Sequence, residues 1–340
     1  MKSFLRFVLP LLLGFGLVYV VFRGQDFSKI GATIRSANIF WLLLCAFLAL
    51  LSNVSRAIRW KTLLEPLNHF PSTVHTTFAV MFGYLANLAF PRLGEVSRCG
   101  ALKKTDNIPL DVSLGTVIAE RIIDLLFLMF ITLATVFLNT DTLFVPILKW
   151  LNTKYSINLS LKESIFGLIA AIGIGLLVLF WIYKGVLKKE NKDTNAAPTT
   201  GKLASFMQGL GNGLKTIFRL QSPKTFWFHS FFIWLMYYLM IICIIKSIPQ
   251  TSMLGFNEAL LVLVIGSFGF VAPVQGGIGA YHAAVSWSLV LIAQSLPNFD
   301  ISSENALAFA TLSHSSQMVF VLIFGLVAVF GIFVNKSIKS

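Results

Sequence analysis

Three charged side chains lie inside an apolar stretch that runs from Val112 to about Leu138: Glu120, Arg121 and Asp124. Glu120 and Asp124 are four residues apart and share one face of a helix, whereas Arg121 points about 100° away. A charge that faces lipid costs roughly 2.5–3.5 kcal/mol, so three would cost roughly 8–10 kcal/mol. We therefore expect these side chains to face protein or water. They form either a structural ion-pair network or a site that binds a headgroup or relays a proton.

A second charged stretch, Phe90–Arg98 (FPRLGEVSR), ends an apolar run that begins near Phe78. Its proline and glycine break a helix, and such a break is tolerated in a membrane only where protein or water covers it. Arg92 and Arg98 can hold a phosphate through paired hydrogen bonds, and Glu95 can balance an arginine or bind an amine. This stretch is predicted to line a polar cavity and to meet the Glu120 segment. The alternative is that both arginines mark the cytoplasmic interface.

Another interruption, Pro273–Ala280, divides an apolar segment near the end of the chain. Its glycines either present backbone amides to an anion or allow close helix packing. The histidine that follows can titrate near neutral pH, or it is a hydrogen-bonded core residue. The candidate residues here are Gly276, Gly277, Gly279, Tyr281 and His282, with His314 in a polar cluster of the last apolar segment.

Arg56 and Arg59 end the apolar segment that begins at Ile39, beside Trp60 and Lys61. Such a basic and aromatic end is typical of a cytoplasmic interface, so we expect both arginines to snorkel there and rank them as secondary site residues. The three cysteines form no pair and the five histidines have no metal-ligand spacing. No catalytic residue, metal or cofactor is therefore expected.

Composition places this chain in a membrane. Of its 340 residues, 56% are hydrophobic and only 12% are charged, against about 25% charged residues in soluble domains. The fold class expected is an all-α, polytopic helical membrane protein, with residues 1–340 as a single membrane domain. The net charge of +13 fits cytoplasmic loops beside anionic lipid rather than nucleic-acid binding, because no basic soluble module is present.

The order of apolar and basic segments predicts two inverted units, each with an interrupted, re-entrant helix pair. The first is 39–139 and is broken on the cytoplasmic side. The second is 225–334 and is broken on the external side. Paired interruptions of this kind indicate a binding site near the membrane midplane of transporters. Between the units we expect a span at 164–183 and a basic cytoplasmic loop at 184–224, with an amphipathic segment at 203–220. A first span at 4–22 and both chain ends in the cytoplasm complete this topology.

Four short motifs occur in order: RxxRW at Arg56–Trp60, FPRLGEVSR at Phe90–Arg98, ERIID at Glu120–Asp124 and PxxGGIGAY at Pro273–Tyr281. Together they resemble the lysylphosphatidylglycerol synthase transmembrane family, flippase-like proteins of the UPF0104 type. The resemblance implies a bacterial inner-membrane protein whose relatives are associated with moving aminoacylated phospholipids between leaflets, or with glycolipid and polyprenyl-phosphate pathways. We expect no C-terminal aminoacyltransferase domain. His282 stands where family members often carry a glutamate, which weakens the expectation of a cationic lysyl-lipid substrate.

The function expected is a lipid translocase that moves an anionic or aminoacylated phospholipid, or a lipid-linked phosphate, between leaflets. No Walker motif is present, so direct use of ATP is not expected. The alternatives are a polytopic transferase or accessory subunit acting on lipid-phosphate substrates, with Glu120 or Asp124 as base, and a scaffold for cell-envelope enzymes. The partners expected are membrane lipids with anionic headgroups and no nucleic acid. A second copy of the chain and envelope-biosynthesis enzymes stay open as partners.

Overall fold

The computed structural model describes residues 2–90, 93–138, 152–153, 167, 202–272, 274–296 and 298–334. Three features of the sequence lie outside these residues: Arg92, the predicted span at 164–183 apart from Gly167, and the first part of the basic loop, 184–201. The candidate residues other than Arg92 are all described.

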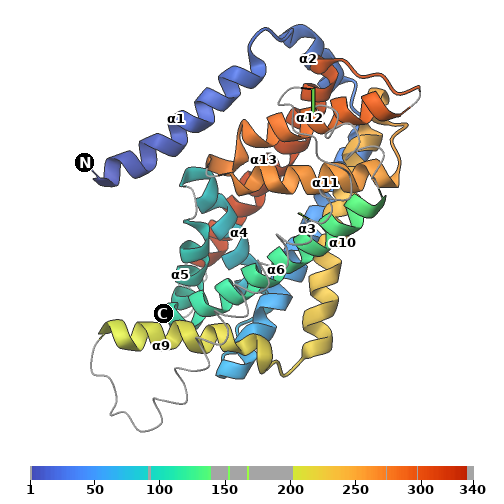
Figure 1. The fold of residues 1–340 in the computed structure, drawn as a ribbon. Helices are drawn as coiled ribbons and strands as arrows, with labels where there is room; N and C mark the ends of the chain where they lie inside the picture. Colours follow the sequence, from blue (N-terminus) through green and yellow to red (C-terminus); the bar gives the residue numbers. More distant parts are fainter. Residues whose placement is uncertain are drawn as a thin grey trace.

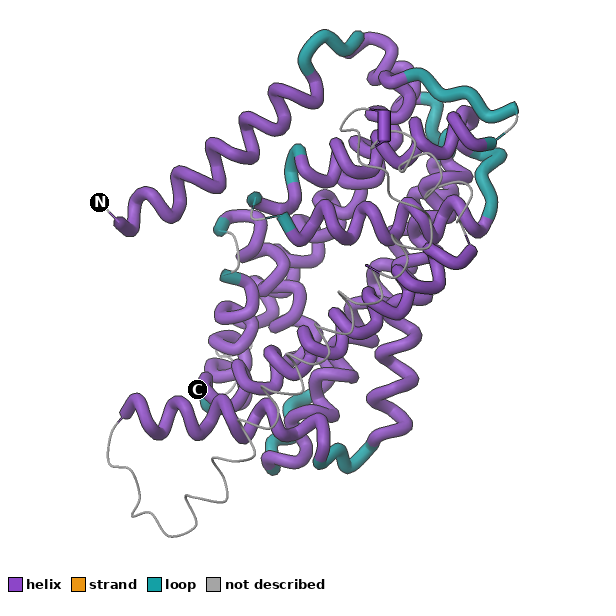
Figure 2. Tube along the Cα trace, in the orientation of Figure 1, coloured by secondary structure: helices purple, strands orange, loops and turns teal. Residues whose placement is uncertain are grey.

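The described part of the chain is built from helices, with no strand among these residues (Figure 2). Five of its helical segments are long and apolar enough to cross a membrane, which confirms the expectation of an all-α, multi-span membrane protein. They are Ile39–Leu67, Leu110–Leu138, Pro223–Ser247, Gln275–Ser295 and Ser303–Phe333.

Figure 1 shows the helices in space, and their order along the chain is as follows. The α-helices are α1 (Lys2–Phe22), α2 (Phe27–Arg35), α3 (Ile39–Leu64), α4 (Thr73–Ala89), α5 (Gly94–Asp106), α6 (Leu110–Leu138), α9 (Lys202–Lys215), α10 (Pro223–Ser247), α11 (Phe256–Val271), α12 (Ala280–Ser295) and α13 (Ser303–Val334). A 3-10 turn, η5 (Gln275–Gly277), lies between α11 and α12. The N-terminal half of α1 stands apart from the bundle, and the rest of this helix packs on η5 and α12.

Local signals in the sequence explain where the central helices begin and end. The side chain of Asn38 accepts a hydrogen bond from the backbone of Phe40 and so caps α3, and Ser72 caps α4 in the same way. Helix α5 ends at Asn107, which adopts the left-handed conformation (φ 56°) that asparagine tolerates. Helices α4 and α5 pack against each other as a short pair, with Gly83 and Gly94 in close contact.

Helix α3 runs six residues beyond the end near Ile58 that the sequence predicted, to Leu64. Its last turns are buried: Ala57, Trp60, Leu63 and Leu64 are each 0% exposed. The whole helix packs along α10, which forms its largest interface. The basic end of this segment therefore enters the protein core and continues as helix, because protein rather than the membrane interface surrounds it.

The turn of the second interruption contacts the end of α4, directly before the first interruption. The side-chain Nε2 of Gln275, in η5, donates to the backbone oxygen of Ala89 at the end of α4 (3.4 Å). A Cβ placed on Gly276 would lie 3.6 Å from the Cδ2 atom of Leu88. The end of α4 and the turn of the α11–α12 pair thus meet, at a contact that is partly exposed.

Large apolar side chains cover much of the outer surface of the bundle. Leu43 on α3, Phe130 on α6 and Phe330 on α13 are 64%, 70% and 70% exposed. A soluble protein rarely exposes extended apolar surface of this kind, whereas lipid tails cover it at no cost. The exposed surface therefore agrees with the five candidate spans.

Candidate functional site

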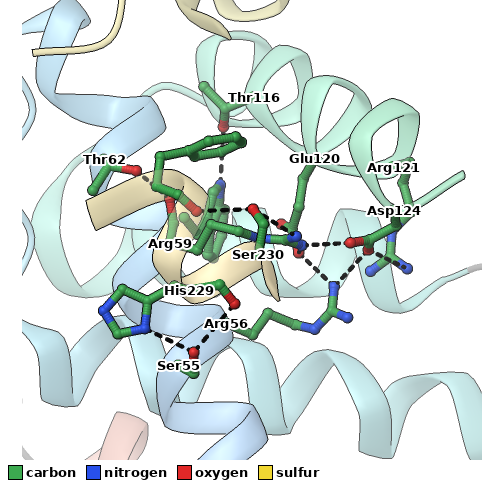
Figure 3. A network of polar contacts seen from close by, with 12 residues as sticks. Ser55, Arg56, Arg59, Thr62, Thr116, Glu120, Arg121, Asp124, His229 and Ser230 are labelled. Carbon is green, nitrogen blue, oxygen red and sulfur yellow. Dashed lines mark hydrogen bonds and ion pairs between the residues drawn. The ribbon is translucent and has the colours of Figure 1, made fainter. Parts of the chain in front are cut away.

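The centre of the site is Glu120 on α6, whose side chain is completely buried. Its Oε1 accepts hydrogen bonds from Nη1 of Arg56 and from Nη2 of Arg59, the latter at 2.9 Å (Figure 3). Its Oε2 lies 2.9 Å from Nη2 of Arg98 on α5. One carboxylate therefore contacts three guanidinium groups from two other helices, and Arg98 is one of the partners that the sequence predicted.

Asp124 lies one turn further along α6, on the same face as Glu120. Its Oδ2 is 2.9 Å from Nη1 of Arg56, and its Oδ1 is 2.8 Å from Nη2 of Arg59. The expected shared face of Glu120 and Asp124 is therefore confirmed, and both acids contact the same two arginines. Figure 3 shows these ion pairs together.

Arg56 and Arg59 do not snorkel, so the sequence-based expectation for them is wrong. They are 3% and 0% exposed, and their guanidinium groups point into the bundle. Nη2 of Arg56 donates to the hydroxyl of Tyr237 on α10 (2.8 Å), and Nη1 of Arg59 lies 3.4 Å from Oγ of Ser230 on the same helix. Glu120 and Asp124 can be buried away from water only when positively charged groups pair with them. This explains why Arg56 and Arg59 turn inward.

Trp60 links the arginines of α3 to that of α5. The guanidinium carbon of Arg98 lies 4.6 Å from the centre of the Trp60 ring, within the range of a cation–π contact. Nε1 of Trp60 donates to Oγ1 of Thr116 on α6 (2.9 Å). The RxxRW motif thus has a physical basis, because its arginines bind the acids of α6 and its tryptophan supports Arg98 and α6.

The buried part of the network carries a surplus of positive charge. Three guanidinium groups (Arg56, Arg59 and Arg98) face two carboxylates (Glu120 and Asp124), which leaves one positive charge unbalanced. The Nε atoms of all three arginines are buried without a hydrogen-bond partner, as are Oε2 of Glu120 and Oδ1 of Asp124. The surplus positive charge in this buried site favours an anion over a cation as a ligand.

The rim of the network is formed by Arg121 and Glu95, whose side chains are 43% and 35% exposed. Nε of Arg121 lies 3.9 Å from Oε1 of Glu95, and Nη1 of Arg121 lies 3.8 Å from Oδ2 of Asp124. These distances are longer than those around Glu120, and the side chains of Arg121 and Glu95 are partly exposed. The charged groups of the rim are therefore more exposed and lie further apart than those around Glu120.

A small open pocket lies between α4, α5 and α6. It has a volume of about 10 Å³, close to the least space that holds a water molecule. The lining residues are Val80, Gly83, Tyr84, Asn87, Gly94, Glu95, Arg98 and Arg121. Three predicted site residues, Glu95, Arg98 and Arg121, thus share one pocket. A ligand larger than water requires this pocket to widen.

The residues of the second interruption form a separate cluster, and none of them lines this pocket. Gly276, Gly277 and Gly279 have φ values of 57°, 74° and 80°, which glycine adopts without strain. A Cβ on Gly277 would lie 2.7 Å from the Phe270 ring, and one on Gly279 would lie 2.7 Å from Cβ of Leu17 in α1. Close packing thus accounts for two of these glycines.

Tyr281, His282 and His314 are buried beside these glycines. The hydroxyl of Tyr281 is 2.7 Å from Oγ of Ser313 on α13. Nε2 of His314 donates to the backbone oxygen of Gly276 (2.8 Å). Of the two clusters, only the first contains charged side chains that pair with each other.

Sequence reasoning missed three polar or aromatic groups of the first cluster: Tyr84, Asn87 and Tyr237. The side-chain oxygen of Asn87 accepts from the backbone of Gly94 and holds the start of α5 (2.7 Å). Tyr84 lines the pocket, and Tyr237 binds Arg56. Asn87 is a polar residue four positions before Pro91, which is the one signal that could have found it. In the described chain no group of three or more His, Cys, Asp or Glu side chains could hold a metal ion.

Comparison with known proteins agrees with the resemblance of the four motifs. The family model described as the lysylphosphatidylglycerol synthase TM region matches residues 7–325. A UPF0104 membrane protein of Methanocaldococcus jannaschii, MJ1595, is 25% identical over 181 residues. That alignment covers 52% of this chain and 54% of the relative, so the chain spans about half the length of the curated relative it matches. No solved structure matches the chain. Because the family model covers nearly the whole sequence, this chain belongs to the lysylphosphatidylglycerol synthase TM region family.

Proposed function

We propose that this protein is a lipid translocase that moves a phospholipid or lipid-linked phosphate between the leaflets of the membrane. The observation that carries the proposal is the buried ion-pair network around Glu120, with its surplus positive charge and its open rim. Ionisable groups inside membrane-spanning segments are expensive to bury, and they mark substrate and ion pathways. An anionic headgroup supplies the charge that this network lacks.

The short helix pairs support a site near the membrane midplane. At 1.5 Å per residue, α4 (17 residues) and α5 (13 residues) are about 25 Å and 20 Å long, less than the roughly 30 Å of the hydrocarbon core. Helices α11 and α12 (16 residues each) are about 24 Å long, and α12 reaches the length of a span only together with the turn η5. Two re-entrant pairs that enter from opposite leaflets would meet at their tips, and the contact of Gln275 with Ala89 fits this arrangement. We therefore propose that 39–139 and 225–334 are inverted units.

In this proposal the headgroup enters the pocket between α4, α5 and α6, and the acyl chains stay in the bilayer. Arg121 and Glu95 release each other first, because their 3.9 Å contact is weak and half exposed. The phosphate then binds Arg121 and Arg98, while Glu120 keeps Arg98 in position. The pocket of about 10 Å³ must widen for this step, so the α4–α5 pair moves during transport.

The same geometry favours a carrier over a transferase. Glu120 and Asp124, the candidate bases of a transferase, are each held by at least two arginines. The arginines occupy the carboxylate oxygens that would have to take a proton from a substrate, so neither acid is placed to act as a base. We further propose a bacterial inner-membrane location with both chain ends in the cytoplasm, which follows from the distribution of basic segments.

The test is leaflet exchange of fluorescent phosphatidylglycerol in proteoliposomes. We expect exchange above that of empty liposomes. We expect Arg121→Gln to lower this exchange at least about tenfold, because Arg121 is a proposed phosphate ligand. The variant should still fold, because this rim arginine contributes little to folding. Arg35→Gln is the matched control, since Arg35 is an exposed arginine on α2. Exchange equal to that of empty liposomes, or equal loss in both variants, would contradict the proposal for this lipid. Product formation from a polyprenyl-phosphate donor would favour the transferase instead.

A further inference from the structure

Two buried histidines face each other at the second interruption. His282 on α12 and His314 on α13 are 6% and 4% exposed, and their ring centres are 4.8 Å apart. The ring of Phe22 from α1 lies 5.7 Å from that of His282, and the ring of Phe270 from α11 stacks 6.0 Å from that of His314. The lipid site proposed above makes no use of this pair.

Each imidazole is bonded to the backbone of the interruption. The backbone N–H of Gly279 points at Nδ1 of His282 (3.4 Å), and Nε2 of His314 donates to the oxygen of Gly276 (2.8 Å). An N–H can donate only to a nitrogen that carries no proton. The contact with Gly279 requires an Nδ1 on His282 that carries no proton, whereas the bond of His314 to Gly276 is compatible with a neutral or a charged ring.

A proton added to Nδ1 of His282 would place two N–H groups opposite each other and break the contact with Gly279. Two charged imidazoles at this distance would also repel each other strongly in a low dielectric, so the pair accepts one proton rather than two. The other ionisable groups nearby are the hydroxyl of Tyr281 on α12 and the thiol of Cys45 on α3, both uncharged at neutral pH. Described side chains of α1, α11 and α13 bring no carboxylate or guanidinium to the pair.

The backbone held by these histidines continues directly to the first interruption. Gln275, next to Gly276, donates to the oxygen of Ala89 (3.4 Å). Ala89 ends α4, and Asn87 in the same turn lines the arginine pocket and binds the start of α5. A change in the turn at Gly276 therefore acts on the helix that forms one wall of the pocket.

We propose that His282 and His314 form a proton-binding site whose occupancy controls the contact between the two interrupted helix pairs. With the pair neutral, the turn holds Gln275 against Ala89. With a proton on Nδ1 of His282, the contact with Gly279 breaks, the turn shifts and the α4–α5 pair is released; a proton on His314 leaves both backbone contacts in place. If the proposed lipid transport is correct, this site links proton movement to widening of the pocket.

The test measures proton binding and the contact between the two pairs, and it does not depend on lipid transport. Histidine nitrogens are followed by NMR in protein labelled with nitrogen-15 and held in nanodiscs, from about pH 8 to about pH 4. Spin labels at Ala89→Cys and Ile278→Cys, with the three native cysteines replaced by alanine, report the distance between the pairs. The variant His282→Asn/His314→Gln places amides near the bonded ring nitrogens and so keeps both backbone contacts without a titrating group.

We expect the pair to bind about one proton per chain, together with a second, longer label distance in the acidic range. In His282→Asn/His314→Gln the longer distance should be absent. His75→Asn is the matched control, because His75 lies in a partly exposed pair with Asp106 and should change neither result. Imidazoles that stay neutral throughout, or a bound proton without a change in distance, would overturn the proposal. A lack of lipid exchange would count against the proposed transport only.

Discussion

Replacing Glu120 by glutamine tests how much the centre of the network contributes to the free energy of unfolding. The native centre has three guanidinium groups and two carboxylates, all contributed by α3, α5 and α6. Glu120→Gln leaves three positive charges against Asp124 alone. Breaking a buried ion pair by removing one partner costs about 3–5 kcal/mol, a large part of the roughly 5–15 kcal/mol that holds a typical protein folded.

Arg59→Gln provides the matched comparison, because it removes a charge of the opposite sign from the same contact. It leaves two guanidinium groups and two carboxylates, so the centre becomes balanced. We therefore expect Arg59→Gln to cost less than Glu120→Gln by at least about 1 kcal/mol. In the double variant the two costs should not add. The cost of the double variant should differ from the sum of the two single costs by roughly 0.5–3 kcal/mol, as is typical of residues in one network.

The assay is reversible unfolding of the purified protein by sodium dodecyl sulfate in mixed micelles, followed by circular dichroism. Asp300→Asn serves as a control, since Asp300 is an exposed acid in a loop and should change the free energy of unfolding by less than about 0.5 kcal/mol. If Glu120→Gln costs no more than Asp300→Asn, or less than Arg59→Gln, the reasoning from surplus positive charge is refuted.

Three further outcomes are expected. Gly213→Leu should release α9 from α6 and raise deuterium exchange in α9, because a Cβ on Gly213 would lie 2.6 Å from backbone atoms of α6. Gly211→Leu should have little effect, because the space around Gly211 is open. Cys99, which is 0% exposed, should resist maleimide until the protein is denatured, whereas Val96→Cys, at a position 47% exposed on the same helix, should react at once. Arg121→Gln should change the free energy of unfolding by no more than about 1 kcal/mol, and a larger loss in the same micelle assay would place this arginine in the structural centre.

The sequence predicted the acids of the network better than its arginines. The spacing of Glu120 and Asp124 fixes a common helical face, and the energy of charge in lipid fixes the direction of that face. The sequence does not show which residues pair with these acids, because an arginine at a helix end can reach either the membrane interface or the interior. Arg56 and Arg59 were therefore assigned to the interface, although the structure buries both.

Contacts between distant helices were the least predictable feature. Tyr237 and Arg56 are far apart in sequence and meet only because α3 and α10 pack along each other. The interruptions at Phe90–Arg98 and Pro273–Ala280 were visible in the sequence, since proline, glycine and charge in an apolar run are local signals. Their contact through Gln275 and Ala89 depends on tertiary packing, which hydropathy does not encode.

The central claim is that the arginine pocket recognises an anionic lipid headgroup. The most direct measurement is native mass spectrometry of the protein after mild extraction, with identification of the lipids that stay bound. We expect an anionic phospholipid or lipid phosphate on the wild-type protein, retained in Arg35→Gln and at least tenfold depleted in Arg121→Gln. The same lipids in the same amounts on all three proteins, or only neutral lipids on the wild type, would contradict the claim.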